Sequence, residues 1–272
     1  MSDKSIAFFD SGVGGLTVLS DALHLLPEEN YIYYADTEHV PYGTKSNDEI
    51  QSLVRDAVYF LSTQNLKALV IACNTATSVV VRELRQIYNL PIVGMEPAVK
   101  PATEIGADMR VLVCATDRTI AEDKLMHLIH DLKAEDRVDL CSLQELVTSA
   151  ENFDFFSDEV VAYIEHRLAT IDWIDYSAIV LGCTHFIYYR NIMRSIIPNH
   201  VSIIDGNMGT IRRLAAVIGK EIDTRRQILS LSRKAQSDLS YSYSRVRYYQ
   251  SGREVPAIYY DNYLRFIEEI GI

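Results

Sequence analysis

A short apolar stretch that occurs twice constrains the fold of this chain more than any other feature. Residues 67–75 are Lys-Ala-Leu-Val-Ile-Ala-Cys-Asn-Thr, and residues 177–185 are Ser-Ala-Ile-Val-Leu-Gly-Cys-Thr-His. Cys183 follows Cys73 by 183 − 73 = 110 residues. Apolar runs of this length, ended by small polar residues, are typical of strands covered by helices on both faces. The sequence therefore predicts two related α/β units.

A second pair of predicted strands repeats the arrangement. Residues 5–9 lead into Asp10 and Ser11, and residues 110–114 lead into Ala115 and Thr116. In open α/β sheets, ligands bind beyond the carboxyl ends of the strands, so both cysteines are expected at a site. We predict an α/β fold of two pseudo-symmetric domains. Each is a mostly parallel sheet flanked by helices, and the active site lies in the cleft between them.

The course of the chain predicts where the two domains meet. Two prolines in residues 95–101 indicate a crossover, and a predicted helix over 209–217 returns the chain to the first unit. We therefore expect a first domain of residues 1–97 and 208–272, and a second domain of residues 98–207.

Composition limits the classes of partner. The chain has 272 residues and a formal net charge of −11, whereas a nucleic-acid-binding surface needs a basic face. No stretch reaches the roughly 18 apolar residues of a membrane span, and no apolar segment follows the charged N-terminus. We expect a cytoplasmic protein with a small-molecule substrate, and neither a nucleic-acid nor a membrane partner.

The four cysteines are expected to be reduced. They can make two disulfides on paper, but a large chain without a secretory signal favours free thiols. Their spacing lacks the CxxC pairs typical of zinc sites, so no metal site is predicted. Cys114 and Cys141 are interpreted as small hydrophobic residues of the core.

Two motifs have alternative interpretations. The turn at residues 12–15 suits anion binding at a helix N-terminus. A dinucleotide-binding GxGxxG motif needs a third glycine where this chain has Thr17, which disfavours that class. The Tyr- and Arg-rich residues 241–249 have a pattern compatible with nucleic-acid stacking, but the acidic chain favours a half-exposed strand. A structural helix is predicted over 261–270.

Two thiols facing one site suit a particular chemistry. Cys183 with His185 alone would suggest a nucleophile for acyl transfer, but that leaves Cys73 unexplained. Of two opposed thiols, one can remove a proton from a carbon while the other supplies a proton to the opposite face, which inverts the stereocentre. Free cysteine titrates near ~8.5, so neighbours such as Asp10 and His185 can tune each thiol.

Hydroxyl and amide side chains gather at the same strand ends. They can hold the carboxylates and amine of an amino acid, although each can also cap a helix. Their clustering favours a site. These residues are Ser11, Asn74, Thr75, Thr116, Thr119 and Thr184.

Four segments carry a family resemblance. Residues 9–18, 41–46, 72–76 and 181–185 resemble, in order, motifs of the glutamate racemases, the cofactor-independent branch of the aspartate/glutamate racemase superfamily. Asp205-Gly206 is similar to a turn that follows the family's second domain.

The resemblance implies a pyridoxal-independent racemase that interconverts L- and D-glutamate and supplies D-glutamate for peptidoglycan. It implies no cofactor, a homodimer, Cys73 and Cys183 as the two bases, and Asp10 and His185 as their assistants. Residues 146–151 depart from the family's Leu-Val-x-Leu-Val-Glu run, but offer Glu151 as an assisting carboxylate. The implied substrate contacts are Ser11, Pro41, Tyr42, Gly43, Asn74, Thr75, Thr116, Thr119 and Thr184.

Two alternatives to this function stay open. A racemase of the same machinery can act on aspartate or a hydantoin, because the pocket sets the substrate. A non-catalytic binding relative, such as one that inhibits gyrase, belongs to a different class. The presence of Cys73, Cys183, Asp10 and His185 argues against it, since a pure binder needs none of them.

Overall fold

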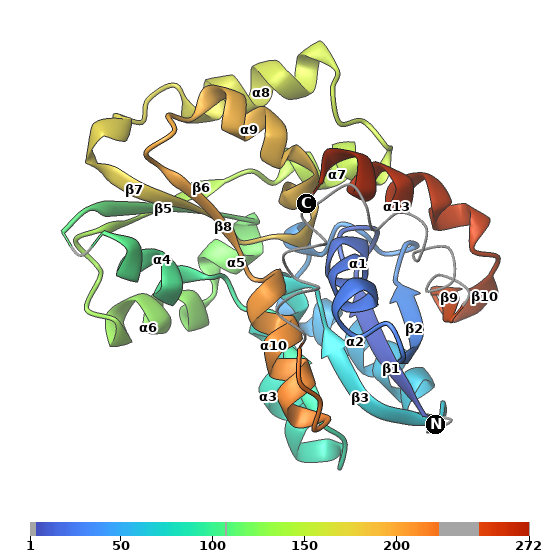
Figure 1. The fold of residues 1–272 in the computed structure, drawn as a ribbon. Helices are drawn as coiled ribbons and strands as arrows, with labels where there is room; N and C mark the ends of the chain where they lie inside the picture. The colour runs from blue at the N-terminus through green and yellow to red at the C-terminus, as the bar shows by residue number, and fades with distance from the viewer. Residues whose placement is uncertain (1–3, 107, 223–244, 272) are drawn as a thin grey trace.

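The computed structural model describes residues 4–106, 108–222 and 245–271, and its strands form two β-sheets (Figure 1). The first sheet has the strand order β10-β9-β2-β1-β3-β4, and the second has the order β6-β5-β7-β8. Neighbouring strands are parallel throughout, apart from the antiparallel pair β9 and β10. The predicted α/β fold with mostly parallel sheets is confirmed.

The elements alternate along the chain as expected for parallel sheets. The strands of the first sheet are β1 (Ser5–Asp10), β2 (Asn30–Ala35), β3 (Leu66–Ile71), β4 (Ile92–Gly94), β9 (Val246–Gln250) and β10 (Arg253–Val255). The strands of the second sheet are β5 (Arg110–Ala115), β6 (Val138–Ser142), β7 (Tyr176–Leu181) and β8 (Ser202–Asp205). The helices are α1 (Leu16–Leu25), α2 (Asn47–Ser62), α3 (Asn74–Ile87), α4 (Val99–Ile105), α5 (Asp117–Ala121), α6 (Asp123–Asp131), α7 (Glu145–Glu151), α8 (Asp158–Leu168), α9 (Arg190–Ile196), α10 (Asn207–Val217) and α13 (Ile258–Ile270). Short 3-10 turns are η1 (Tyr42–Thr44), η2 (Trp173–Asp175) and η3 (Thr184–Tyr189).

The central strand of the first sheet is buried on both faces, which explains its unbroken apolar sequence. Side chains alternate between the faces of a strand, so Ala7 and Phe9 pack with the core under α2 and α3. Ile6 and Phe8 belong to the core that includes residues of α1, α10 and α13. Helices therefore cover both faces of this sheet.

The second sheet is built in the same way. Val111 and Val113 of β5 share a core with residues of α4 and α6. Leu112 and Cys114, on the other face of β5, pack with residues of α7, α8 and α9. This second core is continuous with the α1, α10 and α13 face of the first sheet, so one apolar cluster joins the two sheets.

The internal repeat of the sequence is visible in the strand pairing. β1 lies beside β3, and β5 lies beside β7. Both pairs have a register shift at the same place, between Ser5 and Ile6 in one and between Arg110 and Val111 in the other. Each cysteine of the repeat stands two residues beyond the end of its strand, so the two thiols occupy equivalent positions.

Some boundaries differ from those predicted. The helix expected over 120–132 is divided into α5 and α6, because Glu122 between them has an extended backbone with φ −82° and ψ 131°. The last helix begins at Ile258, three residues earlier than expected. The strand predicted over 241–249 is confirmed in part by β9, which pairs in parallel with β2, while residues 241–244 lie outside the described residues.

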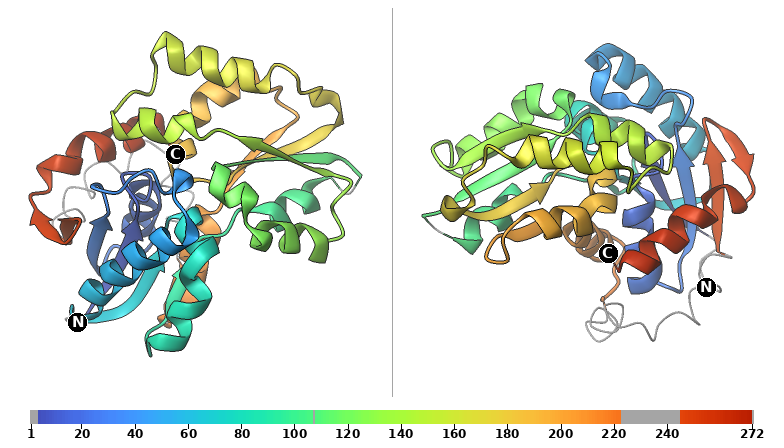
Figure 2. Two further views of the ribbon diagram at one scale, coloured as in Figure 1. Left: turned by 180° about the vertical axis from the view of Figure 1, so that it is seen from behind. Right: turned by 90° about the horizontal axis from the view of Figure 1, so that it is seen from above.

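The C-terminal segment completes the edge of the first sheet. Strands β9 and β10 extend that sheet beyond β2, and α13 then runs back along the molecule beside α1 (Figure 2). Phe266 of α13 stacks on Phe155 with ring centroids 4.3 Å apart, which ties the segment to the loop after α7. Within the described ranges, every helix is too short or too polar to span a bilayer.

Candidate active site

Cys73 lies at the start of α3, where its sulfur caps the helix. Its Sγ accepts a hydrogen bond from the backbone N–H of Ala76 at 3.4 Å, and the Ser11 hydroxyl lies 3.6 Å from the same sulfur. Burial, together with the charge of Asp10, raises the pKa of the Cys73 thiol to about 12, although these two hydrogen bonds oppose the shift. Cys73 is therefore a protonated thiol at neutral pH.

Cys183 lies at the equivalent place beyond β7 and is paired with a histidine. Its Sγ is 3.7 Å from Nδ1 of His185, and Nε2 of His185 is 2.6 Å from Oε1 of Glu151. Burial would lower the pKa of His185, but its hydrogen bonds with Cys183 and Glu151 raise that pKa well above the ordinary value. The imidazole is held in its cationic form by two partners, one on each ring nitrogen.

The glycine turn at residues 12–15 contacts the carboxylate of Glu151, the last residue of α7. The backbone N–H of Val13 donates to Oε1 of Glu151 at 2.7 Å. A Cβ atom at Gly12 would lie 1.7 Å from that oxygen, so only glycine leaves room for the approach. The sequence predicts an anion-binding turn here, and the anion that its backbone contacts is the carboxylate of Glu151.

Asp10 lies at the end of β1 and connects the two halves of the molecule, by which we mean the residues packed around the first sheet and those packed around the second sheet. Its Oδ1 accepts a hydrogen bond from the Gly12 N–H at 3.0 Å, and its Oδ2 accepts one from the Thr184 hydroxyl at 3.2 Å. The residue is fully buried, and this burial raises the pKa of its carboxyl to about 6 against the opposing charge of His185. Asp10 is therefore largely ionised at neutral pH, close to the groups of both half-sites.

Three threonines form a second connection between the halves. The Thr75 Oγ1 lies 2.9 Å from that of Thr116 and 3.2 Å from that of Thr119, and the last two are 3.0 Å apart. Thr116 also caps α5 through the N–H of Thr119, so the helix-cap alternative holds for this residue together with the cluster. All three side chains are buried.

The loop at residues 41–43 packs against the second half. The Tyr42 hydroxyl donates to Asp36 Oδ2 at 2.6 Å, so this hydroxyl is engaged with a protein carboxylate. Gly43 lies against Gln144 and Thr116, where a Cβ atom would meet Oε1 of Gln144 at 2.0 Å. The geometry brings Gly43 to the threonine cluster, while Pro41 forms the cis peptide bond that leads into the loop.

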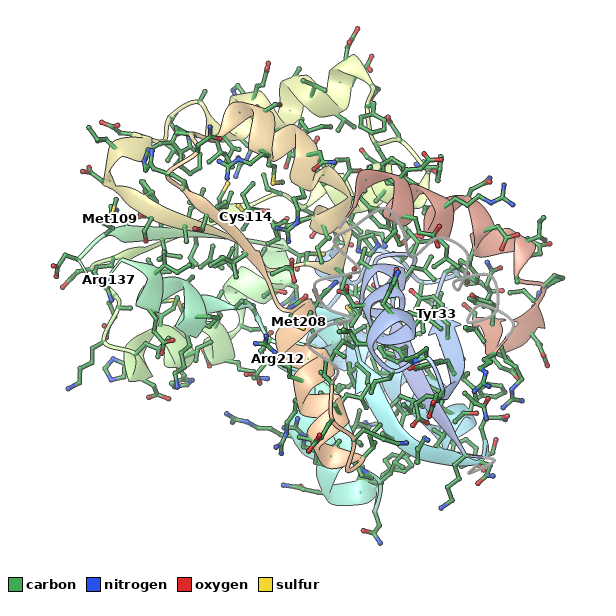
Figure 3. All side chains as sticks on the ribbon, in the orientation of Figure 1. Tyr33, Met109, Cys114, Arg137, Met208 and Arg212 are labelled. Carbon is green, nitrogen blue, oxygen red and sulfur yellow. The ribbon has the colours of Figure 1, made fainter. Side chains whose placement is uncertain are left out.

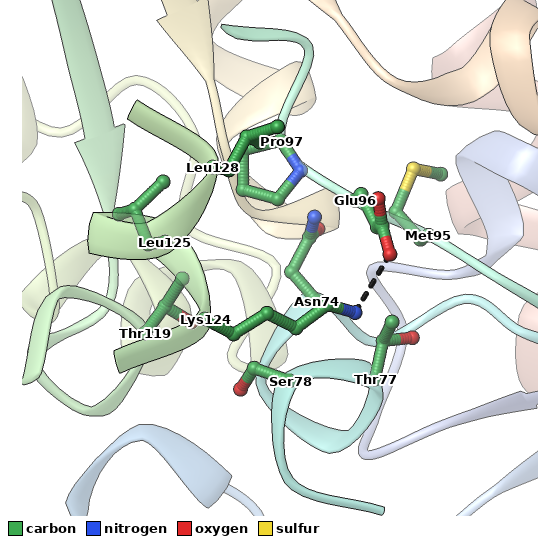
Figure 4. A pocket seen from close by; sticks show the side chains of 10 residues that line it. All are labelled: Asn74, Thr77, Ser78, Met95, Glu96, Pro97, Thr119, Lys124, Leu125 and Leu128. Atoms are coloured by element: carbon green, nitrogen blue, oxygen red, sulfur yellow. Dashed lines mark ion pairs between the residues drawn. The ribbon is translucent and has the colours of Figure 1, made fainter. Parts of the chain in front are cut away.

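Asn74 lines a pocket of about 40 Å³ between the two halves (Figure 4). Thr119 also lines this pocket, together with Leu125 and Leu128 of α6. Lys124 pairs with Glu96 at 2.7 Å along the same pocket, so an ion pair joins α6 to the crossover segment. The lining therefore includes Asn74 from one half of the molecule and Thr119 from the other.

Two residues near these groups are not among the predicted site residues. Gln144 follows β6, and both atoms of its buried side-chain amide lack a hydrogen-bond partner among the described residues. Asp36 follows β2 and also accepts a hydrogen bond from Ser251 at 2.9 Å. Their positions beyond strand ends were the available signal, because the carboxyl ends of parallel strands form the site.

The comparisons with known proteins point to one family. Residues 18–214 match the family model described as Asp/Glu/Hydantoin racemase. The chain is 53% identical over 209 residues to the glutamate racemase of Halothermothrix orenii, covering 77% of this chain and 83% of that protein. It is 46% identical over 215 residues to glutamate racemase 2 of Bacillus subtilis, covering 78% of this chain and 81% of that protein.

A solved structure gives the same result. The structure of Escherichia coli glutamate racemase in complex with L-glutamate and an activator matches with a TM-score of 0.72 and 31% sequence identity, over 81% of this chain and 84% of that chain. The fold, the repeated cysteine strands and these similarities agree. The chain belongs to the Asp/Glu/hydantoin racemase family of isomerases.

Proposed function

We propose that this protein is a glutamate racemase that interconverts L- and D-glutamate by proton transfer between the α carbon and two cysteines, without a cofactor. One observation carries the proposal. Cys73 and Cys183 stand at equivalent strand ends in the two halves, and contacts such as Asp10 with Thr184 join those halves at the same ends.

The two thiols have different surroundings, which suits them to opposite roles. Cys73 is protonated at neutral pH and is therefore the acid that delivers a proton. An imidazolium on His185, 3.7 Å from the Cys183 sulfur, stabilises a thiolate there, so Cys183 acts as the base. With Cys183 as thiolate and Cys73 as thiol, the site converts L-glutamate. That turnover leaves Cys73 as thiolate and Cys183 as thiol, and conversion of D-glutamate then restores the first arrangement.

When Cys73 gives its proton to the α carbon, it becomes a thiolate whose negative charge the site must stabilise. The N-terminus of α3, which already donates the Ala76 N–H to Cys73, also stabilises a thiolate on that residue when it forms. Ionised Asp10 disfavours that thiolate and so opposes proton release from Cys73, whereas the hydrogen bonds with Ala76 and Ser11 favour it. Glu151 is a positioning residue in this scheme, because it acts through His185.

The substrate contacts follow the arrangement of donors. We propose that Asn74, the threonine cluster and the backbone at Gly43 hold the carboxylates of glutamate, with Ser11 and Thr184 beside the two thiols. Pro41 and Tyr42 shape the loop, with the Tyr42 hydroxyl anchored on Asp36. Gln144 adds an amide whose N–H groups suit a carboxylate.

Glutamate is favoured over other substrates by the relatives, which are named glutamate racemases. Aspartate or a hydantoin is the alternative substrate. We further propose that D-glutamate serves peptidoglycan synthesis, that the protein works in the cytoplasm as a homodimer, and that residues 1–97 with 208–272 and residues 98–207 are its two domains.

Substitution of each thiol tests this function. Racemisation of glutamate is expected to fall by several orders of magnitude in Cys73→Ala and in Cys183→Ala, and to persist in Cys141→Ala, a matched thiol outside the site. Glutamate binding, measured by calorimetry, should survive in the first two variants. Full turnover in Cys73→Ala would refute the two-base mechanism, and binding without racemisation in the unmodified protein would indicate a non-catalytic relative.

A further inference from the structure

The second pair of cysteines lies in the second sheet and takes no part in the proposed proton transfer. Cys114 of β5 and Cys141 of β6 are both free and buried, and they face one another directly in the parallel register. Cys114 lies within the second sheet, where β5 has neighbours on both sides (Figure 3). Side chains opposite one another in register point to the same face of the sheet, so the two thiols are neighbours.

The spacing of these strands is compatible with a covalent link. Adjacent strands lie about 4.8 Å apart. Disulfides join residues whose Cα atoms are roughly 4.4 to 6.8 Å apart. The two thiols also influence one another's ionisation, since their interaction raises the pKa of Cys114 and lowers that of Cys141.

Cys141 has the surroundings of a reactive thiol. It lines a surface depression of about 340 Å³ together with His166, Arg167 and Tyr176. Nη2 of Arg167 lies 3.8 Å from its sulfur. The interaction with the Cys114 thiol and then the charge of Arg167 lower the pKa of Cys141 below its ordinary value, against the opposing effect of burial. Cys141 is 7% exposed and Cys114 is fully buried, so Cys141 is the more accessible of the two thiols. Cysteines beside a cation and open to solvent are those that oxidise selectively.

We propose that Cys141 and Cys114 form a peroxide-sensitive pair, in which Cys141 is the attacking thiol and Cys114 the resolving thiol. The Cys141 thiolate attacks hydrogen peroxide, the O–O bond breaks, and the products are a sulfenic acid and hydroxide. The Cys114 sulfur then attacks the sulfenic sulfur and displaces its oxygen, which leaves as water. In total two thiols are oxidised to one disulfide, and one hydrogen peroxide is reduced to two waters.

The modification would act on the same strand ends that carry proposed substrate contacts. Thr116 follows Cys114 by two residues, and Gln144 follows Cys141 by three. A disulfide at this place would bind β5 covalently to β6 just before both side chains. The oxidation itself does not depend on the identity of the substrate, so it stands independently of the proposed function.

Peptide mapping of the intact protein tests the pair. The protein is treated with hydrogen peroxide at low molar excess, alkylated, and digested without reductant. We expect a peptide that joins Cys114 to Cys141 and that dithiothreitol separates. In Cys114→Ser, we expect a lasting sulfenic acid on Cys141 that dimedone traps. Full alkylation of both thiols, or sulfinic acid on Cys141 without linkage, would overturn the proposal.

A rate comparison adds a readout that depends on the arginine. Arg167→Gln is expected to slow the linkage severalfold, because it removes the cation beside the Cys141 sulfur. Glu165→Gln, an exposed change on the same helix, is the matched control and should link at the rate of the unmodified protein. Equal rates in Arg167→Gln and the control would contradict the role of the arginine and with it the assignment of Cys141 as the attacking thiol.

Discussion

Replacing Asp10 by Asn should stabilise the fold while it impairs catalysis. Asn is isosteric with Asp and can keep the hydrogen bond from the Gly12 N–H, but it carries no charge. Burial raises the pKa of Asp10 from the ordinary 3.8 to about 6, a difference of roughly 2. Since one pKa unit corresponds to about 1.4 kcal/mol, ionised Asp10 costs the folded state about 3 kcal/mol at neutral pH.

The sign of this effect fixes its dependence on pH. The folded pKa is raised, so below about pH 4 the carboxyl is protonated in both states and costs nothing. Stability is lost as the pH rises towards about 6, and the full cost applies above that value. The gain from Asp10→Asn should therefore be about 3 kcal/mol at pH 7 and should shrink towards zero at pH 4.

Urea unfolding at several pH values, with racemase activity followed in parallel, measures both consequences. Asp131→Asn, a change at an exposed carboxylate, is the control and should alter stability little. The reasoning is refuted if Asp10→Asn is no more stable than the unmodified protein at pH 7, or if its gain is the same at pH 4. Unchanged kcat would separately remove Asp10 from the mechanism.

Three further substitutions test the site. Glu151→Gln should lower kcat by about tenfold or more. It should also lower the pKa of His185 in an NMR titration, because the carboxylate partner is lost. An unchanged His185 titration would contradict the positioning role of Glu151. Gln144→Leu should raise KM for glutamate roughly tenfold, the effect of one lost hydrogen bond to a charged group, whereas the control Gln64→Leu should leave KM unchanged. Equal KM values for the two variants would exclude a contact between Gln144 and the substrate. Gly12→Ala should still fold by circular dichroism but should lower kcat, since its Cβ would lie 1.7 Å from Oε1 of Glu151 and would displace that carboxylate from the Val13 N–H and from His185. A fully active variant would show that the close approach is wrong.

The sheet architecture and the places of the two cysteines could be predicted because their signals are local. An apolar run such as residues 66–71 specifies a buried strand by itself, and the small polar residues after it mark the strand end. The position of Cys73 beyond that end then follows from a general property of α/β sheets. The repeat of the pattern 110 residues later indicated the second sheet.

The connections within the site could not be predicted, because they join residues far apart in the chain. The Val13 N–H and Glu151 are 138 positions apart, and their contact depends on how the two halves meet. The unpartnered amide of Gln144 against Gly43 has the same origin. The break between α5 and α6 was missed for a different reason: Glu122 has an extended backbone, although glutamate is a good helix former.

Proton exchange in heavy water tests the central claim most directly. The purified protein is incubated with L-glutamate in deuterium oxide, without added pyridoxal phosphate or metal, while optical rotation and deuterium at the α carbon are followed. The two-cysteine account predicts decay of the rotation to zero, with deuterium entering the D-glutamate that forms. A constant rotation with no deuterium uptake would contradict it, and the same assay with aspartate and a hydantoin would then distinguish a racemase of different specificity from a protein that only binds.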